Sequence, residues 1–203
     1  MKHRKSWAMA LVSLSLAAPV PAADYADPTW PCVQRKVEGL SLGLMWPGEI
    51  ASIKMTPELS RVVDDLAARL ALRRIDLDQA QDFVSEFAAA QGRDPVLMGH
   101  VFQKTFDRLA NRRSMIIKGI EEFSLKQIAM TERIDNARKD MDSLMAAEAP
   151  DYDKVDALEE QIDWDERIYT DRQQSLTYIC ETPVLLEKRL YAIAQMLIDA
   201  SKD

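Results

Sequence analysis

Carboxylates are the most numerous side chains that could do chemistry, and many of them follow a predicted turn near residue 150. This acidic group is Asp151, Asp153, Asp156, Glu159, Glu160, Asp163, Asp165 and Glu166. Clustered oxygen ligands can bind Ca²⁺, but the Asp-x-Asp-x-Asp-Gly order of an EF-hand loop is missing. A second group, Asp76, Asp78 and Asp82, also lacks the glycine and the later glutamate. We interpret both groups as solvated helix faces.

Methionine and histidine are the other potential metal ligands. Met141 and Met145 lie one helical turn apart, and thioether sulfur binds Cu(I). Met141 also belongs to a regular apolar pattern, where methionine commonly fills core space. His100 is the only histidine outside the first 22 residues, so one chain cannot build a zinc site from several histidines. We expect no metal site; a metal-binding or metal-delivery protein is the alternative.

Enzyme signatures are lacking. The chain contains no Gly-x-Ser-x-Gly sequence, no Walker-type loop and no dinucleotide-binding Gly-x-Gly-x-x-Gly. We expect His100 on a helix surface or at a core edge rather than as a catalytic base. Glu86, beside Phe87, could serve a small cell-wall-active enzyme, but nothing in the sequence marks a sugar groove. We therefore expect no catalytic residue and no cofactor.

The first 22 residues are typical of a secretory signal peptide. Three basic residues precede an apolar run over 7–18, and the small residue Ala22 precedes the expected cleavage site. That run is shorter than the roughly 20 residues needed to span a bilayer, and an uncleaved anchor is the alternative. Cleavage would remove three basic residues and change the net charge from −7 to −10, which disfavours nucleic-acid binding. We expect a soluble exported protein, most simply periplasmic, without a transmembrane segment.

Cys32 and Cys180 are the only cysteines. Two cysteines in an exported chain usually form an internal disulfide, and we predict that bridge here. Intermolecular bridges and free redox-active thiols are the alternatives. The chain has no Cys-x-x-Cys motif, which disfavours a thioredoxin-like role.

Residues 23–55 are predicted to form an irregular N-terminal arm. Prolines and glycines interrupt any long helix, and the stretch contains the Trp30-Pro31 and Trp46-Pro47 steps. We expect the arm to dock on a core through its tryptophans. A ligand-binding or partner-binding arm is the alternative.

Residues 56–203 are predicted to form a single helical domain. Thr56-Pro57 and Asp94-Pro95 combine an N-cap residue with a proline at the first helical position. Pro183 lacks an N–H group and should kink or restart the last helical stretch, and Thr182 could cap a restart. The expected helices span about 57–73, 78–90, 95–148, 152–181 and 183–201.

Two runs of apolar residues repeat at alternating spacings of three and four, as in a coiled coil. The first is Phe102, Phe106, Leu109, Arg113, Ile116, Ile120, Phe123, Gln127, Met130, Ile134, Ala137, Met141 and Leu144. The second is Val155, Leu158, Ile162, Asp165, Tyr169, Arg172, Leu176, Ile179, Pro183, Leu186, Leu190, Ile193 and Leu197. The short break at Pro150 predicts an antiparallel hairpin.

The hairpin fixes a register in which paired residue numbers sum to about 299. Met130 should therefore face Tyr169, and Phe123 should face Leu176. The same register places Gln127 opposite Arg172, as a polar layer within the seam between the helices.

Trp164 lies off this seam, with Ile168 one turn further on, and Leu125 and Ile128 are also off the seam. Exposed aromatic side chains are favoured at interfaces, so these four residues are candidate partner contacts. Coverage by a third helix, or self-association, is the alternative for Trp164.

Together these patterns predict an all-α fold, with a long antiparallel coiled-coil hairpin on a small helical base and an irregular arm before it. We expect a non-enzymatic exported scaffold, adaptor or chaperone-like protein. Its partners would be other exported or envelope proteins, bound through the hairpin. A periplasmic metal-binding protein is the alternative, and a small cell-wall-active enzyme is the least favoured reading.

Overall fold

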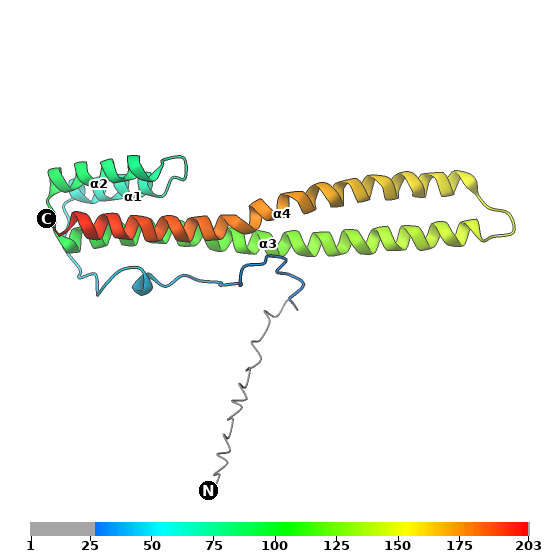
Figure 1. The fold of residues 1–203 in the computed structure, drawn as a ribbon, viewed down its shortest axis with the longest axis horizontal. Helices are drawn as coiled ribbons and strands as arrows, with labels where there is room; N and C mark the ends of the chain where they lie inside the picture. The colour runs from blue at the N-terminus through cyan, green and yellow to red at the C-terminus, as the bar shows by residue number, and fades with distance from the viewer. Residues whose placement is uncertain (1–26, 203) are drawn as a thin grey trace, which may run out of the picture.

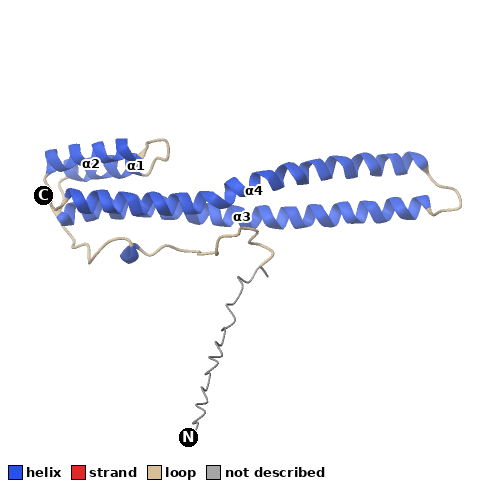
Figure 2. Ribbon diagram, in the orientation of Figure 1, coloured by secondary structure: helices blue, strands red, loops and turns tan. Residues whose placement is uncertain are grey.

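The structure, a computed structural model, describes residues 27–202. The predicted signal peptide lies outside this range. The described chain contains a short 3₁₀ helix η1 (Leu42–Leu44) and four α-helices. These are α1 (Pro57–Leu70), α2 (Leu77–Gln91), α3 (Pro95–Met145) and α4 (Tyr152–Ala200). Figure 2 shows only helices and loops in this part of the chain, which confirms the predicted all-α class.

The helices begin where the capping pattern predicts. The Thr56 hydroxyl accepts a hydrogen bond from the Leu59 amide at 3.2 Å, and Asp94 accepts one from the Val96 amide at 2.9 Å. Each cap satisfies an amide that the first helical turn leaves without a backbone partner. The boundary of α1 differs slightly, because this helix ends at Leu70 rather than near residue 73.

Helices α3 and α4 lie side by side in opposite directions and form the predicted hairpin (Figure 1). The turn between them spans 146–151, and the Asp151 side chain caps α4 by accepting from the Lys154 amide. In the projecting half, buried Met130, Ala137 and Ile162 pack together with partly buried Tyr169. Met130 and Tyr169 thus belong to the same cluster, as the predicted register requires, whereas the direct packing of Met130 on Tyr169 and of Phe123 on Leu176 stays a prediction.

The polar layer at Gln127 differs from the prediction. Gln127 is buried, but its amide donates to the backbone carbonyl of Tyr169 at 3.3 Å. No hydrogen bond between Gln127 and Arg172 occurs within residues 27–202. A helix carbonyl has a second lone pair and can accept this bond. The Oε1 atom of Gln127, the only atom of its side chain that could accept from Arg172, has no hydrogen-bond partner within the described residues.

The predicted restart of the helix at Pro183 is wrong. Helix α4 continues from Tyr152 to Ala200 with Pro183 inside it, although its ribbon steps sideways in the orange part (Figure 1). Proline in a helix interior costs about 3 kcal/mol. Pro183 is buried, and the buried leucines Leu186 and Leu190 follow it in the same helix. The packing of these three residues outweighs the cost of the proline. The Thr182 hydroxyl caps no new helix and instead donates to the Tyr178 carbonyl at 2.9 Å.

The main core lies at one end of the hairpin, where α1 and α2 cover the first turns of α3 and the last turns of α4 (Figure 1). Its fully buried side chains include Leu70, Val84, Phe102, Leu190 and Leu197. The other end of the hairpin projects beyond α1 and α2 (Figure 1). The predicted helical base is confirmed, and the projecting half carries only its own narrow seam.

The arm before α1 is irregular except for η1 and runs along the hairpin (Figure 1). Buried Trp46 stacks on Phe102 with 5.2 Å between ring centroids, so the arm contributes a side chain to the main core. Trp30 is only partly buried and packs beside the two cysteines. The predicted docking through tryptophans is therefore confirmed for both residues, most fully for Trp46.

Candidate functional site

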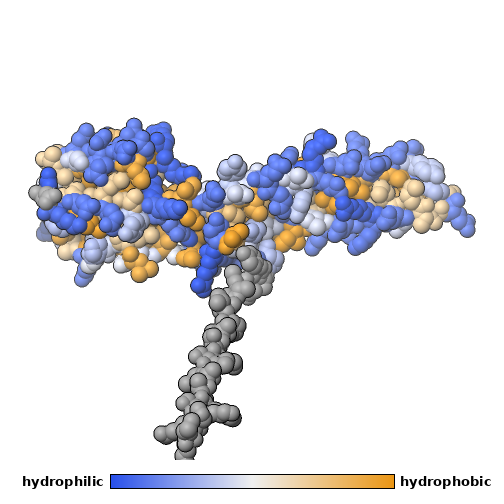
Figure 3. All heavy atoms as spheres, viewed as in Figure 1, coloured by the Kyte–Doolittle hydropathy of each residue, from blue (hydrophilic) through white to orange (hydrophobic). Residues whose placement is uncertain are grey.

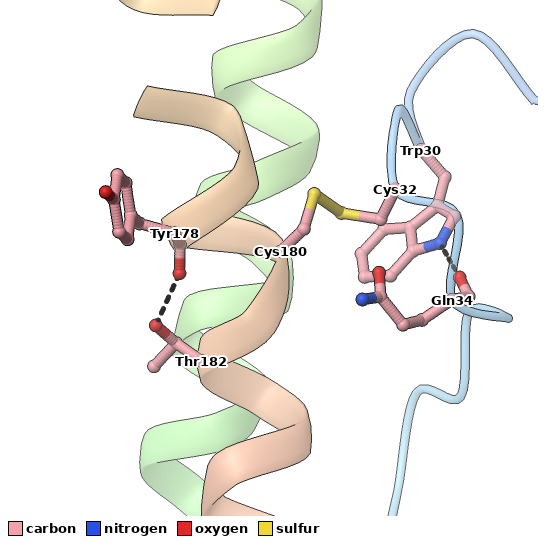
Figure 4. Close-up of a disulfide and its surroundings, with 6 residues drawn as sticks. All are labelled: Trp30, Cys32, Gln34, Tyr178, Cys180 and Thr182. Atoms are coloured by element: carbon pink, nitrogen blue, oxygen red, sulfur yellow. Dashed lines mark hydrogen bonds between the residues drawn. A yellow bond between two sulfur atoms is a disulfide. The ribbon is translucent and has the colours of Figure 1, made fainter. Parts of the chain in front are cut away.

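The two cysteines form the predicted disulfide within one chain. Cys32 in the arm and Cys180 in α4 are 148 residues apart in sequence, with 5.5 Å between their Cα atoms. Both are buried against Ile120 of α3. Figure 4 shows Trp30 beside the bridge, where its indole N–H donates to the Gln34 carbonyl at 2.7 Å. The bridge therefore lies between the arm and the middle of the hairpin as a structural tie.

Buried polar contacts fasten the arm on either side of the disulfide. Arg113 of α3 is 3 % exposed and pairs with Glu187 of α4 at 2.6 Å. Its guanidinium also donates to the Val37 carbonyl at 2.7 Å, which joins the arm to both long helices. On the other side, the Ser124 hydroxyl donates to the Pro28 carbonyl at 2.6 Å. The contacts with Glu187 and Val37 explain why a basic residue, Arg113, occupies a position in the otherwise apolar seam.

The two side chains considered for catalysis occupy different places. His100 lies at a core edge, as expected, and its Nε2 donates to the arm carbonyl of Ala51 at 3.0 Å. Glu86 is exposed on α2 and borders a shallow hollow with Phe83 and Phe87. The structure therefore does not bring these two candidates together.

The acidic side chains near the turn spread along the helix rather than converging on one point. Within residues 27–202, no group of three or more His, Cys, Asp or Glu residues converges as metal ligands would. The Asp151 carboxylate binds the amide and the ammonium of Lys154, and these bonds hold its pKa below the usual range. Asp165 is buried in the seam and accepts from Arg133 at 2.7 Å.

Trp164 is 61 % exposed on α4, in the projecting half of the hairpin. No helix of the described chain covers it, so the alternative of a third helix is wrong for this part of the molecule. Ile168 differs from the expectation, because it is half-buried and packs against the seam cluster around Met130. A residue next to the seam can turn inward where the facing helix leaves space, and only the packing reveals this.

Leu125 and Ile128 are exposed on α3, as predicted. They do not form one surface with Trp164. In the hairpin register Leu125 faces residue 174 and Ile128 faces residue 171, which lie about 15 Å and about 10 Å along the helix from Trp164. Trp164 is therefore the centre of the candidate site, and the two α3 residues belong to another part of the rod.

The side chains around Trp164 leave a hollow of about 700 Å³ on the outward side of α4. Its lining consists of Asp156, Ala157, Glu159, Glu160, Gln161, Asp163, Trp164 and Arg167. A second, mainly apolar hollow of about 540 Å³ lies between the two helices near the turn and shares Ala157 and Gln161 with the first. In Figure 3, hydrophilic residues dominate the projecting half and apolar residues form a broken line along it.

Sequence reasoning treated the acidic residues and Trp164 as separate features. The structure places them on one outward helix face. The signal was present in the spacing, because Asp156, Glu160, Asp163 and Trp164 recur at intervals that keep them opposite the predicted seam.

Comparison of this chain with protein-family models, with curated proteins and with solved structures finds no significant match. Among the described helices, none combines the length and apolar character needed to cross a membrane.

Proposed function

We propose that this protein is an exported, non-enzymatic scaffold, adaptor or chaperone-like protein that binds other proteins through the projecting half of its hairpin. The observation that carries the proposal is Trp164, a large aromatic side chain left 61 % exposed where no other element of the described chain reaches it. Aromatic side chains of this kind dominate the binding energy of many protein interfaces.

The architecture supports a binding role. The base core involves the first turns of α3 and the last turns of α4, and the disulfide ties the arm to the middle of the hairpin. The projecting half is held by its own seam and by ion pairs such as Arg133–Asp165. A rigid projecting rod can contact a partner without disturbing the core. An oxidising compartment, with the periplasm as the simplest case, is supported by the predicted signal peptide and by the Cys32–Cys180 bridge.

The test is site-specific photocrosslinking in cells that express the full chain with its N-terminal segment. A photoreactive residue replaces Trp164 in one variant and Tyr191, which is 58 % exposed near the base, in the control. We expect discrete protein adducts at position 164 and none of the same species at position 191. Identical adducts at both positions, or none at 164, would contradict the proposal.

Two further measurements separate binding from folding and location. Trp164→Ala removes no seam contact, so the free energy of unfolding should change by less than about 1 kcal/mol, and a thermal melt checks this. Fractionation of the same cells should recover the protein in the exported fraction with its cysteines bridged. Recovery in the cytosol with free thiols would contradict export.

A further inference from the structure

The outward face of α4 combines an exposed aromatic ring with carboxylates that have no cationic partner. Within the described residues, the acids of this face form no ion pair: Asp156, Glu159, Glu160 and Asp163. Arg167 is the only basic residue that lines the hollow around Trp164. We call this surface, made of Asp156, Glu159, Glu160, Asp163, Trp164 and Arg167, the Trp164 face.

The acids of the same helix that lie toward α3 behave differently. Asp165 pairs with Arg133, and Glu166 pairs with Arg138. Helix α4 therefore neutralises its inward carboxylates within the chain and leaves its outward carboxylates free. Arg167 supplies one positive charge to the four carboxylates of the Trp164 face, and no other basic residue of the described chain lines the hollow.

The spacing on the Trp164 face makes the acids repel one another. Asp156 and Glu160 are four residues apart, as are Glu159 and Asp163, so each pair lies on adjacent turns of one helix surface. Like charges at this spacing destabilise a helix. A bound cation would relieve the repulsion in addition to making its own contacts, so the face favours cationic partners over neutral ones.

We propose that the Trp164 face binds a basic segment of a partner protein, with a Lys or Arg side chain over the Trp164 ring and neighbouring basic groups on the carboxylates. This inference rests on the proposed function and adds the chemistry of the partner. An aromatic face attracts Lys and Arg, and complementary charge selects partners and speeds their association. The mainly apolar hollow between the two helices, which shares Ala157 and Gln161 with the hollow around Trp164, accommodates an apolar side chain of the same segment.

The charge also disfavours the other occupants. Anionic lipid surfaces and nucleic acids would meet carboxylates, which repel them. In a two-fold dimer formed through this face, the same acids would oppose their own copies. A basic protein segment is the occupant whose charge fits.

The experiment measures binding of a synthetic lysine–leucine amphipathic peptide to the full chain by titration calorimetry, at low and physiological salt. Its counterpart with glutamate in place of lysine is the charge control. We expect the basic peptide to bind, with weaker binding at higher salt, and the acidic peptide not to bind. Trp164→Ala should weaken binding by about 30-fold, as truncation of an interface aromatic anchor does.

Charge variants locate the site. The triple variant Asp156→Asn, Glu160→Gln, Asp163→Asn should weaken binding at least tenfold at low salt and reduce its salt dependence. The matched control, Asp107→Asn, Glu122→Gln, Glu181→Gln, removes the same charge from exposed acids without ion pairs elsewhere on the rod and should change binding less than twofold.

Several results would overturn the inference. Equal binding of the acidic peptide, or equal losses in the two triple variants, would show that local charge does not select the partner. Failure of the wild-type chain to bind the basic peptide would also overturn the inference. A dimer in sedimentation analysis that Trp164→Ala dissociates would assign the face to a second copy. In each case, the crosslinking at position 164 decides separately whether the hairpin binds proteins at all.

Discussion

Arg189 offers a sharp test of how the base is held together, because it joins α4 to the end of α1. Its Nε donates to the Leu70 carbonyl at 2.8 Å and its Nη1 donates to the Ile75 carbonyl at 2.7 Å. Leu70 is the last residue of α1, where backbone carbonyls lack helical partners. Burial is the main reason that the pKa of Arg189 lies below its usual value, and nearby Arg73 lowers the pKa further.

The perturbation is Arg189→Met, which keeps an unbranched apolar stem and removes both donors. A hydrogen bond from a charged donor contributes about 1.5–3 kcal/mol, and both carbonyls would lose their partner. The gain from no longer burying a charge offsets part of this loss, since Nη2 of Arg189 has no hydrogen-bond partner within the described structure. We expect the free energy of unfolding to fall by about 2–4 kcal/mol, a range typical of a broken buried network.

Urea denaturation followed by circular dichroism measures the change. Arg189→Lys should lie between wild type and Arg189→Met, because one ammonium cannot reproduce the planar fork that reaches both carbonyls. Arg112→Met is the matched control at an exposed position of α3 and should change stability by less than about 0.5 kcal/mol. If Arg189→Met were as stable as this control, the assigned role of Arg189 in joining α1 to α4 would be refuted.

Reduction of the Cys32–Cys180 bridge should lower the free energy of unfolding by up to about 5 kcal/mol, the loop-entropy value for a separation of 148 residues. Urea midpoints with and without reductant check this, and an unchanged midpoint with both thiols free would contradict it. Asp151 should matter for the start of α4 in a defined pH range. Its folded-state pKa lies below the ordinary value of 3.8, so its contribution is complete above about pH 3.8 and is lost as the pH falls through the lower folded value. The protection factor of the Lys154 amide, which corrects for the pH dependence of intrinsic exchange, should therefore fall only below pH 3.8, and a fall centred above that pH would argue against the cap.

The patterns that succeeded from the sequence are local ones. Helical periodicity and capping depend on residues three or four positions apart, so the hairpin, its turn and the N-caps at Thr56 and Asp94 could be predicted. The pairing of Cys32 with Cys180 followed because the chain has no other cysteine. The place of Trp164 off the seam followed from the heptad spacing, whereas its exposure depended on the structure, in which no described helix covers it.

Tertiary structure decided the features that depend on distant neighbours. Helix α4 continues through Pro183 because buried packing on both sides outweighs one lost hydrogen bond, and a local rule cannot include that packing. Arg113 and Arg189 are buried because carbonyls far away in sequence accept their hydrogen bonds; Leu70 and Arg189 are 119 residues apart.

The candidate site shows the same division. The sequence by itself determined that Trp164 lies off the seam and that acids are dense after the turn. Only the structure decided that Ile168 turns toward the seam, that Asp165 and Glu166 are neutralised by α3, and that the remaining acids stay free around the ring. The physical reason is that a charge on a helix is paired or unpaired according to what the facing helix presents, and that depends on the register of the folded hairpin.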